Sequence, residues 1–91
     1  MEIPREVRGF FNDKGNLKQL PSKLKKKLLI IEFLAEKFET AKEYSGKEVD
    51  AILNEYHTFN DAATLRRELI MHNVLDRTPD GRTYWKIENE R

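Results

Sequence analysis

The sequence predicts an α+β, mostly helical fold: a winged helix-turn-helix with an extra N-terminal helix and a C-terminal β-hairpin wing. Two observations predict it. Near the C-terminus, helical hydrophobic spacing gives way to two short extended segments around a Pro-Asp-Gly turn. Before them, two helical segments are joined by a turn as short as those of helix-turn-helix pairs. The chain has 91 residues and is expected to form one domain, 1–91.

The N-terminal helix is predicted over residues 4–11. Pro4 suits the first position of a helix, because its missing N–H would have no partner there. Three apolar side chains share one face of this helix: Val7, Phe10 and Phe11. Turn-forming residues at 12–16 are expected to end it.

The longest helix is predicted over residues 21–38, with Pro21 at its start, and it is apolar on two sides. One face holds Leu24, Leu28, Ile31, Leu34, Ala35 and Phe38. The opposite side holds Leu29, Ile30 and Phe33. A helix of this kind is usually central and covered on both faces. We expect the N-terminal helix to cover the second face, with self-association as the alternative cover.

Residues 46–57 and 61–73 are predicted to form the helix-turn-helix. Ser45 and Glu48 match a capping box, in which a hydroxyl and a carboxylate each satisfy a free backbone N–H. The first helix has a narrow apolar stripe of Val49, Ile52, Leu53 and Tyr56.

The turn between these helices has its own signals. His57 is expected to bond a free carbonyl at the end of the first helix. Asn60 or Asp61 is expected to cap the second helix, which buries Leu65 and Leu69.

The wing is predicted over residues 74–87, as two strands around the turn at 78–81. Tyr44 is expected in a brief strand ahead of the helix-turn-helix. Because side chains alternate along a strand, only one of Tyr84 and Trp85 faces the core. We expect Trp85 to be the buried one.

Composition excludes several classes of site. The chain has no cysteine, which removes disulfides and thiolate metal ligands. His57 and His72 are too far apart in sequence to form a helical ligand pair, so no metal site is expected. No glycine-rich phosphate loop and no catalytic residues are found, so we expect neither a cofactor nor enzymatic activity. No apolar run approaches the ~20 residues of a membrane span, so a soluble, cytoplasmic protein without a membrane partner is expected.

The charges nearly cancel, with 17 Lys and Arg against 16 Asp and Glu. Their distribution is uneven, because residues 1–27 hold eight basic and three acidic residues. Residues 44–86 hold six basic and seven acidic residues. A winged helix-turn-helix is typical of a DNA-binding or transcription-associated module without catalytic activity, and its helix-turn-helix and wing would contact the DNA. Here that segment, 44–86, is slightly acidic, which argues against a simple DNA-binding interpretation.

Candidate contacts with double-stranded DNA lie on three elements. On the second helix of the helix-turn-helix they are Thr64, Arg66 and Arg67. On the wing they are Arg77, Arg82 and Lys86, opposed by Asp76 and Asp80. The basic start of the long helix adds Lys25 and Lys26 as peripheral contacts. For Arg66 the competing interpretation is an ion pair with Asp61, Asp50 or Glu55.

A second hypothesis is a protein-interaction or homodimerisation module. Its contact surface would consist of Leu29, Ile30, Phe33, Ile70 and Met71. The nearly neutral segment at 44–86 favours this hypothesis.

Residues 8 to 86 resemble a family of small prokaryotic domains known as domain of unknown function number two-zero-eight-seven. The most specific segments are Leu65-Arg66-Arg67-Glu68-Leu69 and Asp80-Gly81-Arg82-x-Tyr84-Trp85. Members of that family occur alone or joined to helix-turn-helix regulators, so the resemblance implies a role in transcription. It implies no catalytic or ligand-binding residues.

Overall fold

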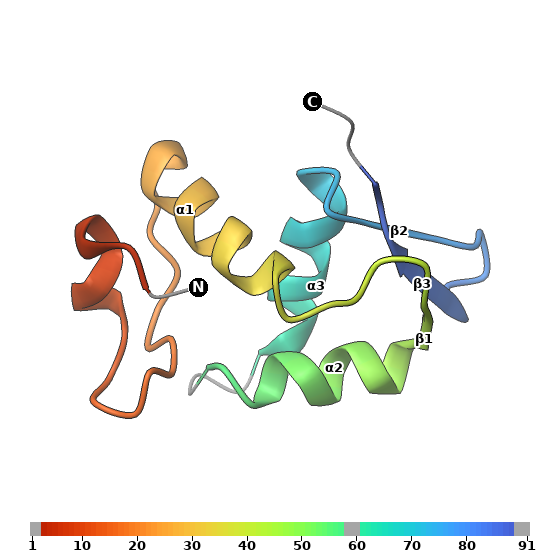
Figure 1. Ribbon diagram of the computed structural model, residues 1–91, viewed down its shortest axis with the longest axis horizontal. Helices are drawn as coiled ribbons and strands as arrows, with labels where there is room; N and C mark the ends of the chain where they lie inside the picture. Colours follow the sequence, from red (N-terminus) through yellow and green to blue (C-terminus); the bar gives the residue numbers. More distant parts are fainter. Residues whose placement is uncertain (1–2, 58–60, 89–91) are drawn as a thin grey trace.

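The computed structural model describes residues 3–57 and 61–88 (Figure 1). Its elements are the 3₁₀ helix η1 (Arg5–Phe10), α1 (Leu24–Ala35), β1 (Glu43–Ser45), α2 (Gly46–Asn54), α3 (Ala62–Met71), β2 (Leu75–Arg77) and β3 (Thr83–Lys86). A helix, a short strand, two helices and a closing hairpin follow one another in the order of a winged helix. The α+β fold class with an added N-terminal helix is thus confirmed.

The three strands form one antiparallel sheet in the order β1-β3-β2. The central strand β3 pairs Tyr84 with Tyr44 on one side and with Arg77 on the other. At the turn of the wing, the Gly81 N–H donates to the Thr78 carbonyl at 2.9 Å, and Gly81 has a φ of +71°. A glycine adopts that angle without steric cost, so the predicted Pro-Asp-Gly turn is confirmed.

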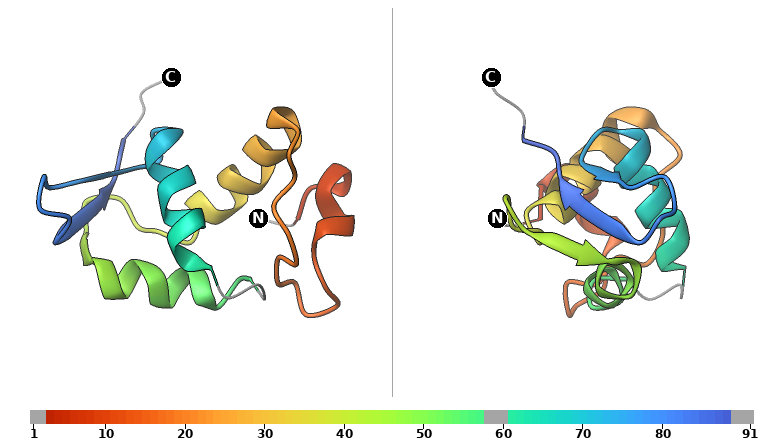
Figure 2. Two further views of the ribbon diagram at one scale, coloured as in Figure 1. Left: turned by 180° about the vertical axis from the view of Figure 1, so that it is seen from behind. Right: turned by 90° about the vertical axis from the view of Figure 1, so that its right-hand side faces the viewer.

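The sheet and η1 lie at opposite ends of the molecule, with the three α-helices between them (Figures 1 and 2). The N-terminal segment, the three α-helices and the sheet all contribute side chains to one core. Its side chains with less than 2% exposure are Val7, Leu17, Ile30, Leu34, Val49, Leu53, Leu65, Leu69 and Leu75. The N-terminal segment is therefore part of the same core as the helix-turn-helix and the wing.

The second apolar face of α1 is covered by the N-terminal segment, as predicted. The rings of Phe11 and Phe33 meet edge to face with centroids 5.3 Å apart, and Val7 is fully buried. Leu17 continues this layer through isolated bridges to Phe11 and His57. Ile30 and Phe33 are buried by these contacts, so they are not available for the docking surface considered above.

Helix α1 is shorter than the predicted 21–38. Its first turn holds no acidic residue, and its N-cap, Lys23, has an extended backbone and no capping side-chain hydrogen bond. After Ala35 the chain continues through tighter turns, in which Phe38 N–H donates to the Ala35 carbonyl. Leu24 and Leu28 were expected on a buried face, yet they are 57% and 38% exposed.

The two helices of the helix-turn-helix also end earlier than predicted. Helix α2 stops at Asn54 rather than 57, and α3 stops at Met71 rather than 73. Asn73 ends α3 with a positive φ of 61°, and the Val74 N–H donates to the Leu69 carbonyl at 2.8 Å. This is the usual way in which a left-handed residue closes a helix, with asparagine in place of glycine.

The expectation that Trp85 faces the core is wrong. Tyr84 is the buried residue, at 6% exposure, while Trp85 is only half-buried. Tyr84 pairs with the buried Tyr44 and lies against Gly46, where a Cβ would stand 3.6 Å from its ring. This inner position beside the start of α2 accommodates the tyrosine, so alternation turns Trp85 to the outer face of the sheet.

Candidate nucleic-acid interface

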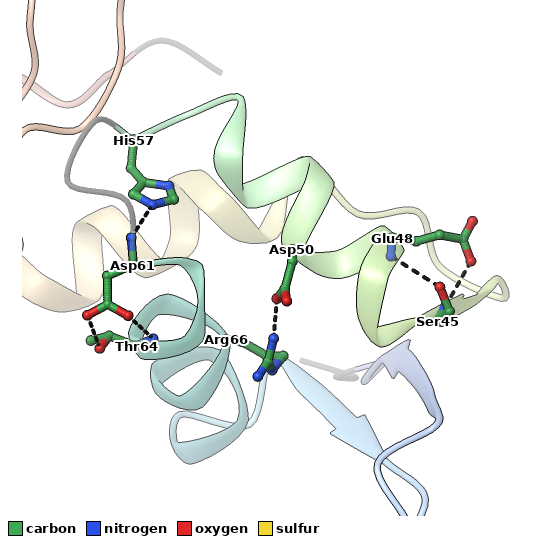
Figure 3. A network of polar contacts seen from close by, with 7 residues as sticks. All are labelled: Ser45, Glu48, Asp50, His57, Asp61, Thr64 and Arg66. Atoms are coloured by element: carbon green, nitrogen blue, oxygen red, sulfur yellow. Dashed lines mark hydrogen bonds and ion pairs between the residues drawn. The ribbon is translucent and has the colours of Figure 1, made fainter.

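The start of each helix in the helix-turn-helix is fixed by a side-chain cap (Figure 3). Before α2, the predicted capping box is confirmed: Ser45 Oγ accepts from the Glu48 N–H, and a Glu48 carboxylate oxygen accepts from the Ser45 N–H. These hydrogen bonds lower the pKa of Glu48. Before α3, Asp61 accepts from the Thr64 N–H at 3.2 Å. Asn60, the alternative cap, lies outside the described residues.

His57 links the end of α2 to the start of α3. Its Nδ1 lies 2.7 Å from the Leu53 carbonyl oxygen, so this nitrogen donates the hydrogen bond expected from the sequence. Its Nε2 then accepts from the Asp61 N–H at 2.9 Å. The imidazole ring is buried, and Figure 3 shows its contact with Asp61, the residue that caps α3.

The outer face of α3 is formed by three exposed residues at helical spacing: Ala63, Arg67 and Met71. Leu65 and Leu69 hold the opposite face in the core. Arg67 therefore lies at the centre of the outer face and forms no hydrogen bond or ion pair in residues 3–57 and 61–88. Of the side chains proposed on this helix, Arg67 has the most freedom to contact a phosphate.

The Arg66 side chain is engaged in an ion pair within the domain. Its Nη1 bonds the Asp50 carboxylate of α2, so the ion-pair interpretation applies to this residue (Figure 3). The side chains are 26% and 39% exposed, which leaves the pair accessible to solvent. Arg66 thus joins the two helices, and its charge is largely offset.

Thr64 is also engaged within the chain. Its hydroxyl donates to Asp61 at 2.6 Å, while its backbone N–H donates to the same carboxylate. Both hydrogen bonds lower the pKa of Asp61. The Thr64 side chain therefore supports the helix cap and has no remaining donor for a base edge.

The three basic residues of the wing differ in their freedom. The Arg82 side chain is 86% exposed, and its guanidinium makes only a loose contact of 3.7 Å with Asp80, which also accepts the Arg82 backbone N–H at 3.0 Å. Arg77 is exposed beside the turn, where a Cβ on Gly81 would stand 3.9 Å from its Nη1. Lys86 instead points inward and donates to the Phe38 carbonyl at 3.3 Å. The wing thus presents two arginines to solvent.

The basic start of α1 is partly neutralised by the chain itself. Lys27 forms an ion pair of 3.2 Å with Glu68 of α3, and Lys26 lies 5.9 Å from the centre of the Phe10 ring. Lys25 is exposed and forms no ion pair among the described residues. Two of these lysines therefore have a partner within the fold.

Residues 16–86 match a family model whose description is "Uncharacterized protein conserved in bacteria (DUF2087)". The chain belongs to the DUF2087 family. The resemblance noted from the sequence is confirmed, although the match begins after Phe10 and Phe11. No curated protein and no solved structure matches the chain closely enough to be assigned as a relative.

In this DUF2087 domain, two residues that the sequence interpretation did not select bear on the interface. Lys47 is exposed at the start of α2, next to Gly46, whose Cβ would lie 3.8 Å from the Gly81 carbonyl. It therefore adds a basic residue near the turn of the wing. Glu68 is nearly buried between Lys27 and His72, with which it forms contacts of 3.2 and 3.6 Å. The packing of the wing against the start of α2 places Lys47, and the packing of α1 on α3 places Glu68, so local sequence signals could not have indicated either position.

Two further findings limit the kinds of site in the described part of the DUF2087 chain. There, no three or more His, Asp and Glu side chains gather in a group that could hold a metal ion. None of the helices in residues 3–57 and 61–88 has the length and apolar character needed to span a membrane.

Proposed function

We propose that this DUF2087 domain is a non-catalytic, transcription-associated module that binds double-stranded DNA. The observation that carries the proposal is the position of Arg67, which is exposed at the centre of the outer face of α3 and has no ion pair with the described residues. In winged helices this face enters the major groove and the wing contacts the backbone. The exposed Arg77 and Arg82 of the wing would supply those backbone contacts.

The proposed contacts are mostly with phosphate rather than with bases. Ala63 is small and allows close approach, whereas Met71 offers no hydrogen bond to a base edge. The surface proposed to bind DNA carries four exposed basic residues: Arg67, Arg77, Arg82 and Lys47. Lys25 lies at its periphery. Thr64, Arg66, Lys26 and Lys86 contribute less, because they have partners within the chain. We therefore expect weak, strongly salt-dependent affinity with little sequence discrimination.

A salt titration of binding to random duplex DNA tests this proposal. Fluorescence anisotropy should give a log–log slope between about −2 and −4, because each neutralised phosphate releases close to one counterion. The change Arg67→Ala should weaken binding by about 1–3 kcal/mol and reduce the slope by about one. The matched control is Arg5→Ala, which removes the same charge from exposed η1, at the end of the molecule opposite the wing. Equal effects of both changes, or no binding at low salt, would contradict the proposal.

The second candidate function is a protein-interaction or homodimerisation module. Three large apolar side chains favour it, because Leu24, Leu28 and Met71 are 57%, 38% and 60% exposed. They differ from the surface proposed from the sequence, of which Met71 alone is exposed. Light scattering tests this candidate: a concentration-dependent dimer that Leu24→Glu abolishes would favour it, and a monomer at all concentrations would contradict homodimerisation.

The absence of catalysis and a cytoplasmic location are parts of the same proposal. A duplex DNA partner places the domain in the compartment of the bacterial chromosome. The hydrogen bonds that hold Asp61, Asp80 and Glu48 serve turns and helix caps. These hydrogen bonds lower the pKa of each of the three carboxyl groups. The groups are therefore ionised at neutral pH and are poor general acids.

A further inference from the structure

The outer face of the sheet carries an aromatic ring between two carboxylates. In the strand register, Trp85 of β3 pairs with Glu43 of β1 on one side and with Asp76 of β2 on the other. Side chains directly opposite each other in an antiparallel sheet share a face, with Cβ atoms about 4.5–5.5 Å apart. These three residues therefore form a row across the sheet, on the face opposite the buried Tyr84. In Figure 2 (right) the sheet lies in front of the helices.

The row lines an open hollow of about 640 Å³. Ala41 and Ile87 add apolar surface to the hollow, and Glu88 adds a third carboxylate. Trp85 is half-buried and therefore retains a solvent-accessible part of its side chain. Five of the eight residues that line the hollow are charged, so this surface suits a charged ligand that can also contact the Trp85 ring.

The carboxylates of the hollow have no ion pair within the described part of the chain. Within residues 3–57 and 61–88, neither Glu43 nor Asp76 nor Glu88 forms an ion pair, and Asp76 accepts only the adjacent Arg77 N–H. The two lysines of the hollow are engaged elsewhere. Lys86 donates to the Phe38 carbonyl, and Lys42 pairs with Glu39 and lies 5.1 Å from the Tyr44 ring centre. With three carboxylates against these two lysines, the hollow has a net charge of −1, which favours a cation over an anion.

We propose that the outer face of the sheet binds an arginine side chain from another polypeptide. A guanidinium group is planar and stacks on an indole ring, while its N–H groups reach carboxylates at the ring's edges. Glu43 and Asp76 stand on the two sides of Trp85, which matches that requirement. Lysine fits less well, because its ammonium is a strongly hydrated point charge that cannot stack and bond two carboxylates at once.

The surface proposed to bind DNA is basic, whereas the proposed arginine site is acidic. Arg67, Arg77, Arg82 and Lys47 are basic, whereas the hollow is lined by three carboxylates without an ion pair in the described chain. The two proposals are therefore independent: loss of DNA binding would leave the arginine site intact, and the reverse also holds.

The site can be tested by the fluorescence of Trp85, which is the only tryptophan in the chain. The probe is a blocked triarginine peptide, compared with trilysine and triglutamate peptides of the same length, and calorimetry gives a second measure of affinity. We expect a saturable change in emission with triarginine, weaker binding of trilysine and no binding of triglutamate. The double change Glu43→Gln and Asp76→Asn should weaken triarginine binding about tenfold, as expected for two solvent-exposed charged contacts.

The matched control is the double change Glu32→Gln and Asp13→Asn. It alters the net charge equally but at exposed positions on α1 and the loop after η1. The control should keep wild-type affinity, and circular dichroism should show that both variants are folded. Equal weakening in both variants, equal affinity for trilysine, or a non-saturating response to triarginine would each overturn the proposal.

Discussion

The Arg66 guanidinium of α3 and the Asp50 carboxylate of α2 form an ion pair that joins the two helices of the helix-turn-helix. This pair changes the meaning of the Arg-Arg sequence in α3. One arginine stabilises the helix pair, and the adjacent Arg67 is left exposed. Neighbouring residues of the same type thus have separate roles, which follow from the 100° between successive side chains on a helix.

Changing Asp50 to Asn should have opposite effects on stability and on DNA binding. The free energy of unfolding should fall by about 0.5–1 kcal/mol, because a partly exposed ion pair is lost. DNA affinity should rise, since one negative charge is removed and Arg66 becomes free to contact phosphate. Urea unfolding and fluorescence anisotropy measure the two quantities. The matched change Glu32→Gln, on the exposed surface of α1, should alter neither quantity by a comparable amount. A fall in DNA affinity for Asp50→Asn would contradict the expectation.

The segment ahead of the family match should be essential for stability. Phe11 is 6% exposed and packs edge to face on Phe33, so Phe11→Ala should lower the free energy of unfolding by about 3 kcal/mol. The half-buried neighbour Phe10 provides the control, and Phe10→Ala should cost clearly less. Denaturant unfolding measures both changes. Equal small effects would indicate that the N-terminal segment packs only loosely on α1.

The cap of α3 should make stability depend on acid pH. Hydrogen bonds from the Thr64 hydroxyl and N–H lower the pKa of Asp61 below its ordinary value of 3.8. Its stabilising contribution is therefore complete above pH 3.8, and it is lost as the pH falls through the lower pKa of the folded state. Asn at this position still caps the helix but does not ionise. The difference in Tm between wild type and Asp61→Asn should therefore shrink as the pH falls below 3.8.

A pH series of thermal unfolding curves checks this expectation. The control is Asp13→Asn, because Asp13 is exposed and accepts no hydrogen bond in the described parts of the chain. A constant Tm difference for Asp61→Asn across the series would show that the carboxylate charge adds nothing to the cap.

The positions of Tyr84 and Trp85 predict unequal costs of truncation. Tyr84→Ala should lower the free energy of unfolding by about 3 kcal/mol, as for a buried aromatic residue. Trp85→Ala, on the outer face, should cost about 1 kcal/mol. Iodide should also quench the fluorescence of Trp85 in the folded protein. The reverse order of the two costs, or protection of Trp85 from iodide, would contradict the assigned faces of β3.

Local signals in the sequence predicted most of the fold. The capping box at Ser45, the cap at Asp61 and the Pro-Asp-Gly turn each depend on residues within a few positions of one another. The buried faces of α1 and β3 were harder to predict. Periodicity separates the two faces of an element, but it does not tell which face packs against the rest of the domain. Trp85 lies outside because Tyr84 pairs with Tyr44 and packs beside Gly46, contacts that are distant in sequence.

In the candidate site, too, local features could be predicted from the sequence and contacts between distant segments could not. Exposure of Arg67 followed from its spacing to Leu65 and Leu69 within one helix. The partners of Arg66, Lys86 and Lys27 lie on other elements, 16, 48 and 41 residues away in sequence. Which basic residues remain free was therefore decided by tertiary contacts, and composition alone overstated the basic surface.

The bond from His57 to both helices has a consequence for how the domain recognises a partner. Because one buried imidazole joins the Leu53 carbonyl to the Asp61 N–H, the two helices are fixed relative to each other before any encounter. Association then needs no ordering of this pair, so little conformational entropy is lost on binding. On the proposed binding to DNA, α2 and α3 would meet the duplex in the relative arrangement that His57 holds in the free domain.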